Sequence, residues 1–350
     1  MTRRKTSQNH KLRNNMHFNF TILYRYVGIV VLTWVLPWLV AGCVKEDFSG
    51  CPTGSYSIAF EYVNHTDAEH PNRFCTDVHR IDLYVFDSTG HFVKCITNSE
   101  APFTEGFRIE PELPEGNYTL VAWGNICDEV IIRPAFVSGK TTIEEGLLSL
   151  KAIENQSVNK KLTSIFHAIK EVTVDGFTDK TDILSFTKNE NQLNLTVKWF
   201  EKSGIPCIHR CAEGVRARVV DPKGATYKFD NSVVASSNEL TYYPYQNANN
   251  DARNQLESVF SLMRLVEGEK LTLLIERLMP SGTIKELYHT DLIELIRMHP
   301  YAYTQSELDR RDVYEIEISL IDDLDGDTDT YMQTAIIIAG WKIILQDTGM

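Results

Sequence analysis

Alternating apolar and polar residues recur along most of the chain, and this pattern predicts β-strands with one buried face. Residues 81–87 alternate in this way before the turn Ser88-Thr89-Gly90, and residues 193–199 alternate again. At residues 117–125 both faces are apolar, as in a strand inside a sandwich core. Further strands are predicted at residues 56–62, 170–174, 215–219, 227–230, 271–275 and 314–320, with turns at 113–116 and 221–224.

Helical patterns are few. Residues 141–153 and 159–168 carry apolar residues at helical spacing, and we predict short helices there that pack against the first group of strands. The clearest helix is expected at residues 290–298, with Thr290 or Asp291 as its N-cap. Many strands and few helices together predict an all-β (mainly) fold.

The chain ends in an apolar run at residues 331–346. This run predicts either one terminal strand or a hairpin broken at Gly340, apolar on both faces. An exposed strand of this kind invites pairing at its edge, so we expect it to be buried in a sandwich or offered to a partner. Trp341 in this run, like Trp123 and Trp199, lies in a strand pattern and is interpreted as a core residue rather than a ligand platform.

The length of 350 residues fits two domains, each large enough to bury its own core. The composition, with 43% hydrophobic and 10% aromatic residues, is that of a folded globular chain. A polar stretch at residues 176–182 separates two strand-rich halves and is the best candidate for a boundary. We therefore expect an N-terminal β-sandwich in residues 55–180 and a C-terminal β-sandwich in residues 181–350.

The amino end has the pattern of a secretory signal. Six Lys and Arg residues precede an apolar run at residues 27–41, and no acidic residue occurs before Glu46. The run is shorter than the roughly 20 residues that a membrane-spanning helix needs. Residues 1–42 are therefore predicted to be a signal peptide. Met16 lies closer to the apolar run than Met1 and is an alternative start.

The apolar run ends in Leu39-Val40-Ala41-Gly42-Cys43, which resembles a lipobox. Small residues let signal peptidase II cleave between Gly42 and Cys43, and Cys43 is predicted to carry N-acyl and S-diacylglycerol groups at the start of a tether, residues 43–54. Each buried CH2 contributes about 0.8 kcal/mol, so three acyl chains hold a membrane far more firmly than one. The alternative is ordinary cleavage with Cys43 as a structural thiol.

Lys45, Glu46 and Asp47 follow the cysteine closely. A Lys followed by acidic residues resembles the signal that sends lipoproteins of Bacteroides-like bacteria to the outer face of the outer membrane. Without residues 1–42 the chain keeps 29 basic and 47 acidic side chains, a formal charge of −18. Such an acidic protein repels phosphate backbones and anionic lipids, which argues against nucleic acid and against electrostatic membrane binding.

Three motifs that could carry chemistry fail on their spacing. Ser138-Gly139-Lys140-Thr141 lacks the glycine that a phosphate-binding loop needs, because Pro134 stands at that place. Residues 322–329 depart from the pattern of a calcium loop, and residues 207–211 have no fourth zinc ligand nearby. We therefore expect no cofactor, no metal site and no catalytic residue.

Six cysteines remain beside Cys43, and six allow 15 pairings. Export permits disulfides, but a chain of this size does not need them, so buried free thiols are an equal alternative. Cys207 and Cys211 would lie about 13 Å apart along a straight strand and could pair only across a tight turn. The six are Cys51, Cys75, Cys95, Cys127, Cys207 and Cys211.

Several of these segments, in their order and spacing, resemble the FimB-type fimbrial anchor lipoprotein family, the lipidated subunits at the base of Bacteroides-like fimbriae. The resemblance implies two tandem transthyretin-like β-sandwich domains, lipid attachment at Cys43, and a role in fixing, and terminating or limiting, a fimbrial shaft at the outer membrane. The matching stretches are residues 42–47 with 51–52, 78–87, 116–125, 227–231, 305–316 and 340–341.

Subunits of such fimbriae join by strand exchange, so the resemblance also implies fimbrial shaft subunits as partners. The physical basis is backbone pairing along a sheet edge, where alternate side chains give specificity. Two alternatives belong to other classes. One is a surface adhesin that binds glycans or host proteins directly, and the other is an exported hydrolase, which needs carboxylates or histidines gathered in a cleft.

Overall fold

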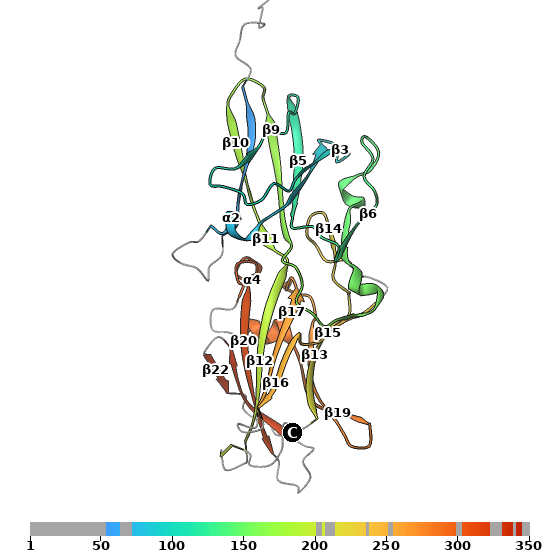
Figure 1. Ribbon diagram of the computed structural model, residues 1–350, viewed down its shortest axis with the longest axis vertical. Coiled ribbons are helices and arrows are strands. Elements are labelled where there is room, and N and C mark those ends of the chain that lie inside the picture. The colour runs from blue at the N-terminus through green and yellow to red at the C-terminus, as the bar shows by residue number, and fades with distance from the viewer. Residues whose placement is uncertain are drawn as a thin grey trace, which may run out of the picture. The chain divides into compact units, whose positions relative to one another are not determined.

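Strands dominate the computed structural model, and its helices are short (Figure 1). The prediction of a mainly β fold is therefore confirmed. Every described residue belongs to one compact unit, residues 53–350. The structure describes residues 54–63, 72–200, 205–206, 214–235, 238–250, 255–298, 303–322, 331–338 and 341–344.

Eight strands from the N-terminal half form two sheets around a common core. They are β1 (Tyr56–Glu61), β2 (Ile81–Asp87), β3 (Phe92–Asn98), β4 (Arg108–Ile109), β5 (Gly116–Gly124), β9 (Phe166–Val174), β10 (Lys180–Ser185) and β11 (Thr187–Lys188). The sheet orders are β10-β1-β4 and β11-β9-β5-β2-β3. The strand predicted at residues 81–87 is confirmed as β2, in which Ile81, Leu83 and Val85 are fully buried. Asp82 and Phe86 are buried as well, so both faces of β2 are covered rather than the single face that the alternation predicted.

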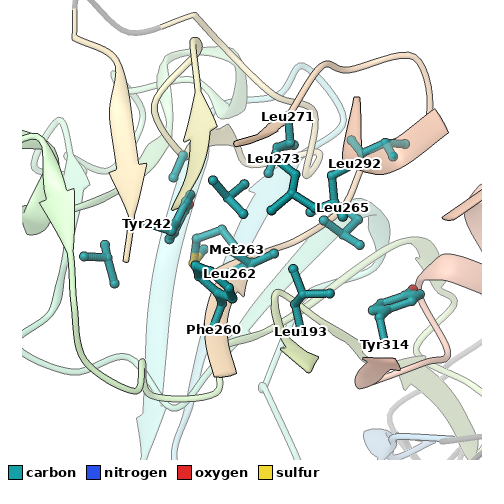
Figure 2. Packing of buried hydrophobic residues seen from close by; sticks show 14 of the residues in the cluster. Leu193, Tyr242, Phe260, Leu262, Met263, Leu265, Leu271, Leu273, Leu292 and Tyr314 are labelled. Atoms are coloured by element: carbon teal, nitrogen blue, oxygen red, sulfur yellow. The ribbon is translucent and has the colours of Figure 1, made fainter. Parts of the chain in front are cut away.

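A six-stranded and a five-stranded sheet form the C-terminal sandwich, in the orders β16-β17-β12-β20-β21-β22 and β19-β18-β13-β15-β8. Figure 2 shows its core, where Leu193 and Phe260 of the first sheet lie near Leu273 and Tyr242 of the second. The strands are β8 (Ser157–Val158), β12 (Glu190–Phe200), β13 (Val215–Asp221), β15 (Leu240–Tyr242), β16 (Gln246–Asn250), β17 (Gln255–Met263), β18 (Thr272–Leu278), β19 (Ile284–Asp291), β20 (Val313–Asp322), β21 (Tyr331–Ile338) and β22 (Trp341–Ile344).

Strands from the two halves of the chain also share sheets. β14 (Thr226–Lys228) pairs with β7 (Leu147–Leu150), which pairs in turn with β6 (Val130–Arg133). In the same way β8 pairs in parallel with β15. The predicted boundary between residues 180 and 181 falls at the start of β10, which pairs with β1 as far as Ser185. The division of the chain at this point stays a prediction.

The predicted helix after residue 290 is confirmed as α3 (Leu292–Arg297). Asp291 is its N-cap, since its carboxylate accepts hydrogen bonds from the backbone N–H groups of Ile293 at 3.0 Å and Glu294 at 3.3 Å. Two further helices are single turns that the sequence patterns had not indicated. They are α2 (Phe74–Asp77) and α4 (Gln305–Leu308).

The helices predicted at residues 141–153 and 159–168 are wrong. The first range holds β7 between two short 3-10 turns, η2 (Ile143–Glu145) and η3 (Lys151–Glu154), and the second runs into β9. Leu148 and Leu150 alternate with polar or half-buried neighbours and are buried, because β7 pairs with strands on both sides. Pairing with distant strands has therefore decided the conformation over helical spacing.

The apolar C-terminal run forms the hairpin that was one of its two predicted alternatives. β21 and β22 pair in antiparallel fashion, with Ile338 opposite Trp341 and Ala335 opposite Ile344. β21 also pairs with β20. The hairpin therefore supplies the last two strands of the six-stranded sheet.

A buried pair of amides fixes the start of β12 against the turn that follows β14. The side chains of Asn189 and Asn231 donate hydrogen bonds to each other, at 2.6 Å and 3.1 Å. Asn189 is completely buried and Asn231 is 6% exposed. Two amides that satisfy each other in this way leave a buried donor and acceptor without a partner if either side chain is removed.

We predict that Asn189→Ala lowers the free energy of unfolding by about 1 to 3 kcal/mol, because the amide of Asn231 then stays buried and loses its partner. The matched control is Asn117→Ala, which removes an exposed hydrogen bond from Thr173 and should cost less than about 0.5 kcal/mol. Urea denaturation followed by circular dichroism measures both. Equal losses in the two variants would contradict the role given to the buried pair.

Candidate functional site

The residues predicted to anchor the protein lie before the described part of the chain. These are Gly42, Cys43, Lys45, Glu46 and Asp47, and the structure describes the chain only from Gly54 onward. Their roles in cleavage, lipidation and surface export therefore stay predictions.

The outer edge of the six-stranded sheet is the candidate site for pairing with another chain. β22 pairs with β21 on one side, and among the described residues no strand pairs with its other side. An edge strand presents a row of backbone N–H and C=O groups that can pair with an added strand. Other edges of the two large sheets are formed by β16, β19 and the two-residue β8.

A polar hollow lies on the same sheet, over β12, β20 and β21. Its volume is about 390 Å³. The carboxylate of Glu317, which lines it, lies 2.6 Å from the ammonium group of Lys198. Amide, hydroxyl and carboxylate groups thus gather close to the hairpin that carries the open edge. The lining residues are Asn194, Thr196, Glu315, Ile316, Glu317 and Ile337.

A buried cluster of charged and hydroxyl groups lies where the chain passes from β11 into β12. Glu190 is only 2% exposed. Its carboxylate accepts hydrogen bonds from Ser261 at 2.6 Å and Ser164 at 3.2 Å, and it lies 3.2 Å from the ammonium group of Lys188. Lys188 also lies 3.5 Å from Asp312. Because its oxygens interact with three side chains, we interpret Glu190 as a residue that stabilises the contact between these segments.

The sequence patterns did not single out this cluster. The only feature that could have indicated it was a charged residue, Glu190, three positions before the alternating segment at residues 193–199. The partners of Glu190 come from segments far apart in the sequence, so no local spacing could reveal them.

His167 is buried, and its contacts are those of a residue that stabilises the fold. Its Nε2 donates a hydrogen bond to the carbonyl of Phe229 at 2.8 Å, and its ring centroid lies 4.6 Å from that of Trp123. Burial lowers the pKa of His167 to about 4. The imidazole is therefore neutral at physiological pH and serves as a hydrogen-bond donor inside the core.

The segment Ser138-Gly139-Lys140-Thr141 is a closed turn. The backbone N–H of Val137 donates to the hydroxyl of Thr141 at 2.9 Å, and Gly139 N–H donates to the carbonyl of Phe92 at 2.8 Å. Residues 207–211 and most of 322–329 lie outside the described residues. In the part of the chain that the structure describes, no three His, Cys, Asp or Glu side chains gather closely enough to hold a metal ion.

The cysteines and tryptophans can be placed in part. Cys75, Cys95 and Cys127 are free thiols, while Cys51, Cys207 and Cys211 lie outside the described residues, so the question of disulfides stays open for these three. The prediction that Trp123 and Trp199 are core residues is confirmed, since both are buried. The side chain of Trp341 lies outside the part of the structure that is described, so its role stays a prediction.

Comparison with known families gives a match over almost the whole chain. Residues 48–347 match the family of fimbrillin-A associated anchor proteins Mfa1 and Mfa2. The chain belongs to this family. The resemblance to fimbrial anchors predicted from the sequence is therefore confirmed, and the family is one of structural anchor proteins rather than enzymes.

Individual relatives agree with this assignment. The chain is 25% identical over 316 residues to the minor fimbrium anchoring subunit Mfa2 of Porphyromonas gingivalis, covering 87% of this chain and 90% of that one. The solved fimbrial anchor protein Mfa2 of Porphyromonas gingivalis is 21% identical and shares the fold with a TM-score of 0.67, over 84% of this chain and 99% of the other.

A candidate polysaccharide binding protein from Bacteroides thetaiotaomicron also shares the fold. Its TM-score is 0.70 at 22% identity, over 84% of this chain and 99% of the other. The fold of the anchor family is thus present over the body of the chain. No helix among the described residues is both long and apolar enough to cross a membrane.

For this family member we predict that acid weakens the fold through His167. A histidine has a pKa of about 6.5 in the unfolded chain, so the lowered pKa of His167 in the folded state contributes stability that is complete above pH 6.5. This contribution is lost as the pH falls to about 4, and it amounts to about 3 kcal/mol.

The variant His167→Gln keeps an amide donor but does not titrate. Between pH 7 and pH 4 the free energy of unfolding should therefore fall by about 3 kcal/mol more in the parent protein than in this variant. His79→Gln, at an exposed position, is the control and should follow the parent protein. If the free energy of unfolding changed with pH in the same way in His167→Gln and in the parent protein, the prediction for this buried imidazole would be contradicted.

Proposed function

We propose that the chain is an outer-membrane surface lipoprotein that anchors a fimbrial shaft, and terminates or limits it, through β-strand pairing with a fimbrial subunit. Membership of the anchor protein family over residues 48–347 is the observation that carries this proposal. The proposed organisation is a signal peptide (1–42), a lipidated tether (43–54) and two β-sandwich domains (55–180 and 181–350).

The lipid anchor is supported by the order of features at the amino end. The basic segment, the apolar run and Ala41-Gly42-Cys43 follow one another as in exported lipoproteins, and Lys45, Glu46 and Asp47 fit the proposed surface-export signal. The described chain begins only eleven residues after Cys43, at Gly54. A tether of that length spans at most about 40 Å when extended, which keeps the sandwich body near the membrane.

Strand pairing with the shaft is supported by the C-terminal hairpin. β22 is the last strand of the six-stranded sheet, and its free side among the described residues offers main-chain groups in extended conformation. A shaft strand added there would pair through its backbone, and the neighbouring polar hollow would supply side-chain specificity.

A second candidate function is direct adhesion to glycans. The hollow lined by Asn194, Thr196, Glu315 and Glu317 presents groups that suit sugar hydroxyls, and one protein of similar fold is a candidate polysaccharide binder. Binding of the isolated chain to immobilised glycans, without copurification of fimbrial subunits, would favour this alternative over anchoring.

We predict that Cys43→Ala releases both the protein and its fimbriae into the medium, because the acyl chains that hold the tether in the membrane are then missing. Immunoblots of washed cells and of the medium measure the distribution of both. The control is Cys51→Ala, which leaves the lipobox intact and should keep both on the cells. Retention of protein and fimbriae on washed Cys43→Ala cells would contradict lipid anchoring.

We also predict that a photo-crosslinking residue at position 342 in β22 forms a crosslink to a fimbrial subunit on intact cells. The same residue at the exposed position 289 in β19, on the edge of the opposite sheet, should give none. Mass spectrometry of the crosslinked band identifies the partner. A crosslink from position 289 and none from position 342 would place the shaft at a different edge.

A further inference from the structure

The strand that follows the proposed tether is paired in parallel with the strand that leads into the second sandwich. β1 and β10 lie side by side (Figure 1), with Tyr56 opposite Lys180 and Glu61 opposite Ser185. The other neighbour of β1 is β4, which contributes only two residue pairs. β10 is therefore the main backbone partner of the first strand after the tether.

Side chains tie the two strands together at their amino ends. Both the backbone N–H and the hydroxyl of Ser55 donate to the same carboxylate oxygen of Asp179, each at 2.8 Å. The hydroxyls of Ser57 and Thr181 are hydrogen-bonded at 2.9 Å. Bonds to a charged acceptor such as Asp179 are stronger than bonds between neutral groups. This end of the ladder is thus held by more than its backbone pairing.

The carboxyl ends of the same strands are tied as well. The hydroxyl of Ser185 donates to the carboxylate of Glu61, and the backbone N–H of Phe186 donates to the carbonyl of Glu61 at 2.8 Å. Within the ladder, the buried carboxylate of Asp182 accepts a hydrogen bond from Tyr56 at 3.1 Å and lies 2.9 Å from the ammonium group of Lys170. Polar ties therefore accompany the ladder along its whole length.

Parallel pairing decides how this ladder would bear tension. A pull on the tether acts at the amino end of β1, whereas a pull on the second sandwich acts at the carboxyl end of β10. These ends lie at opposite ends of a ladder of six residue pairs, so the two strands are driven to slide along each other. Sliding loads all the hydrogen bonds at once, whereas peeling from one end breaks them one after another.

We propose that β1 and β10 form a mechanical clamp, the β1–β10 clamp, which carries tension from the membrane tether to the second sandwich. While it holds, residues 62–179, which form the covalent path between the two strands, are not pulled out into an extended chain. This inference rests on the proposed anchor function, because only a chain held at its amino end and pulled through its body is loaded in this direction.

Single-molecule pulling on the full chain in detergent tests the clamp by changing only the points of attachment. Handles coupled through a non-natural amino acid at residues 53 and 187 pull the strands along each other. Handles at residues 53 and 177 lie at the same end of the ladder, since Gly54 N–H donates to the carbonyl of Gly176 at 3.0 Å. This second pair peels β1 away from β10.

At the same loading rate, the first geometry should rupture at no less than about twice the force of the second, and rupture should release about 450 Å of chain. Equal rupture forces in the two geometries would overturn the proposal. The measurement uses the isolated protein, so it can fail while Cys43→Ala still releases fimbriae from cells, and the reverse also holds.

A pair of matched variants tests the side-chain ties. The double variant Ser55→Ala with Ser185→Ala removes hydroxyl bonds at both ends of the clamp and should shorten its lifetime under constant load about tenfold in the first geometry. The control Thr173→Ala removes an exposed hydroxyl bond to Asn117 in the neighbouring β5–β9 ladder and should leave the lifetime unchanged. An equal loss in both, or no loss in the double variant, would count against the clamp.

Discussion

The register of β12 between its two neighbours is the constraint on which the second sandwich depends. β12 pairs with β17 in antiparallel fashion from Glu190 to Lys198 and with β20 in parallel from Gln192 to Phe200. Since alternate side chains point to opposite faces, this register places one set in the core and the other beneath the polar hollow. A slip by one residue would exchange the two sets. The buried set is Leu193, Leu195, Val197 and Trp199.

The same register connects the two halves of the protein at the amino end of β12. It places Glu190 beside Lys188 and Ser261, and Lys188 lies near Asp312, which also accepts a hydrogen bond from Tyr62 of the first sandwich at 2.6 Å. Buried charges are tolerated only where each has its partners, so a shift of either half would leave one of them unpaired. The polar cluster therefore fixes the relation between the two sandwiches, whose apolar residues meet where Phe86 and Trp123 join the core of the second.

Local pattern was sufficient for strands with one buried face and for a helix with a capping residue, as β12 and Asp291 show. It failed at residues 141–153, where a distant strand decided the conformation. It also gave no sign that β10 begins at Lys180, inside the polar stretch at residues 176–182 that was the candidate boundary. The partner of Thr181 is Ser57, 124 residues away, and no local spacing contains that information. For the candidate site, the apolar hairpin was predictable, but its position at a sheet edge was not.

The two longer parallel ladders, β1–β10 and β12–β20, have a common relation to the ends of the chain. In each, the chain enters the first strand at one end of the ladder and leaves the parallel partner at the other end. Parallel strands need a long crossover, and closing such a loop slows folding. An antiparallel hairpin in the same place would form sooner, but its two chain ends would lie together and tension would peel it open. Parallel pairing, which folds more slowly, is therefore the arrangement that resists a pull between the two ends of the protein.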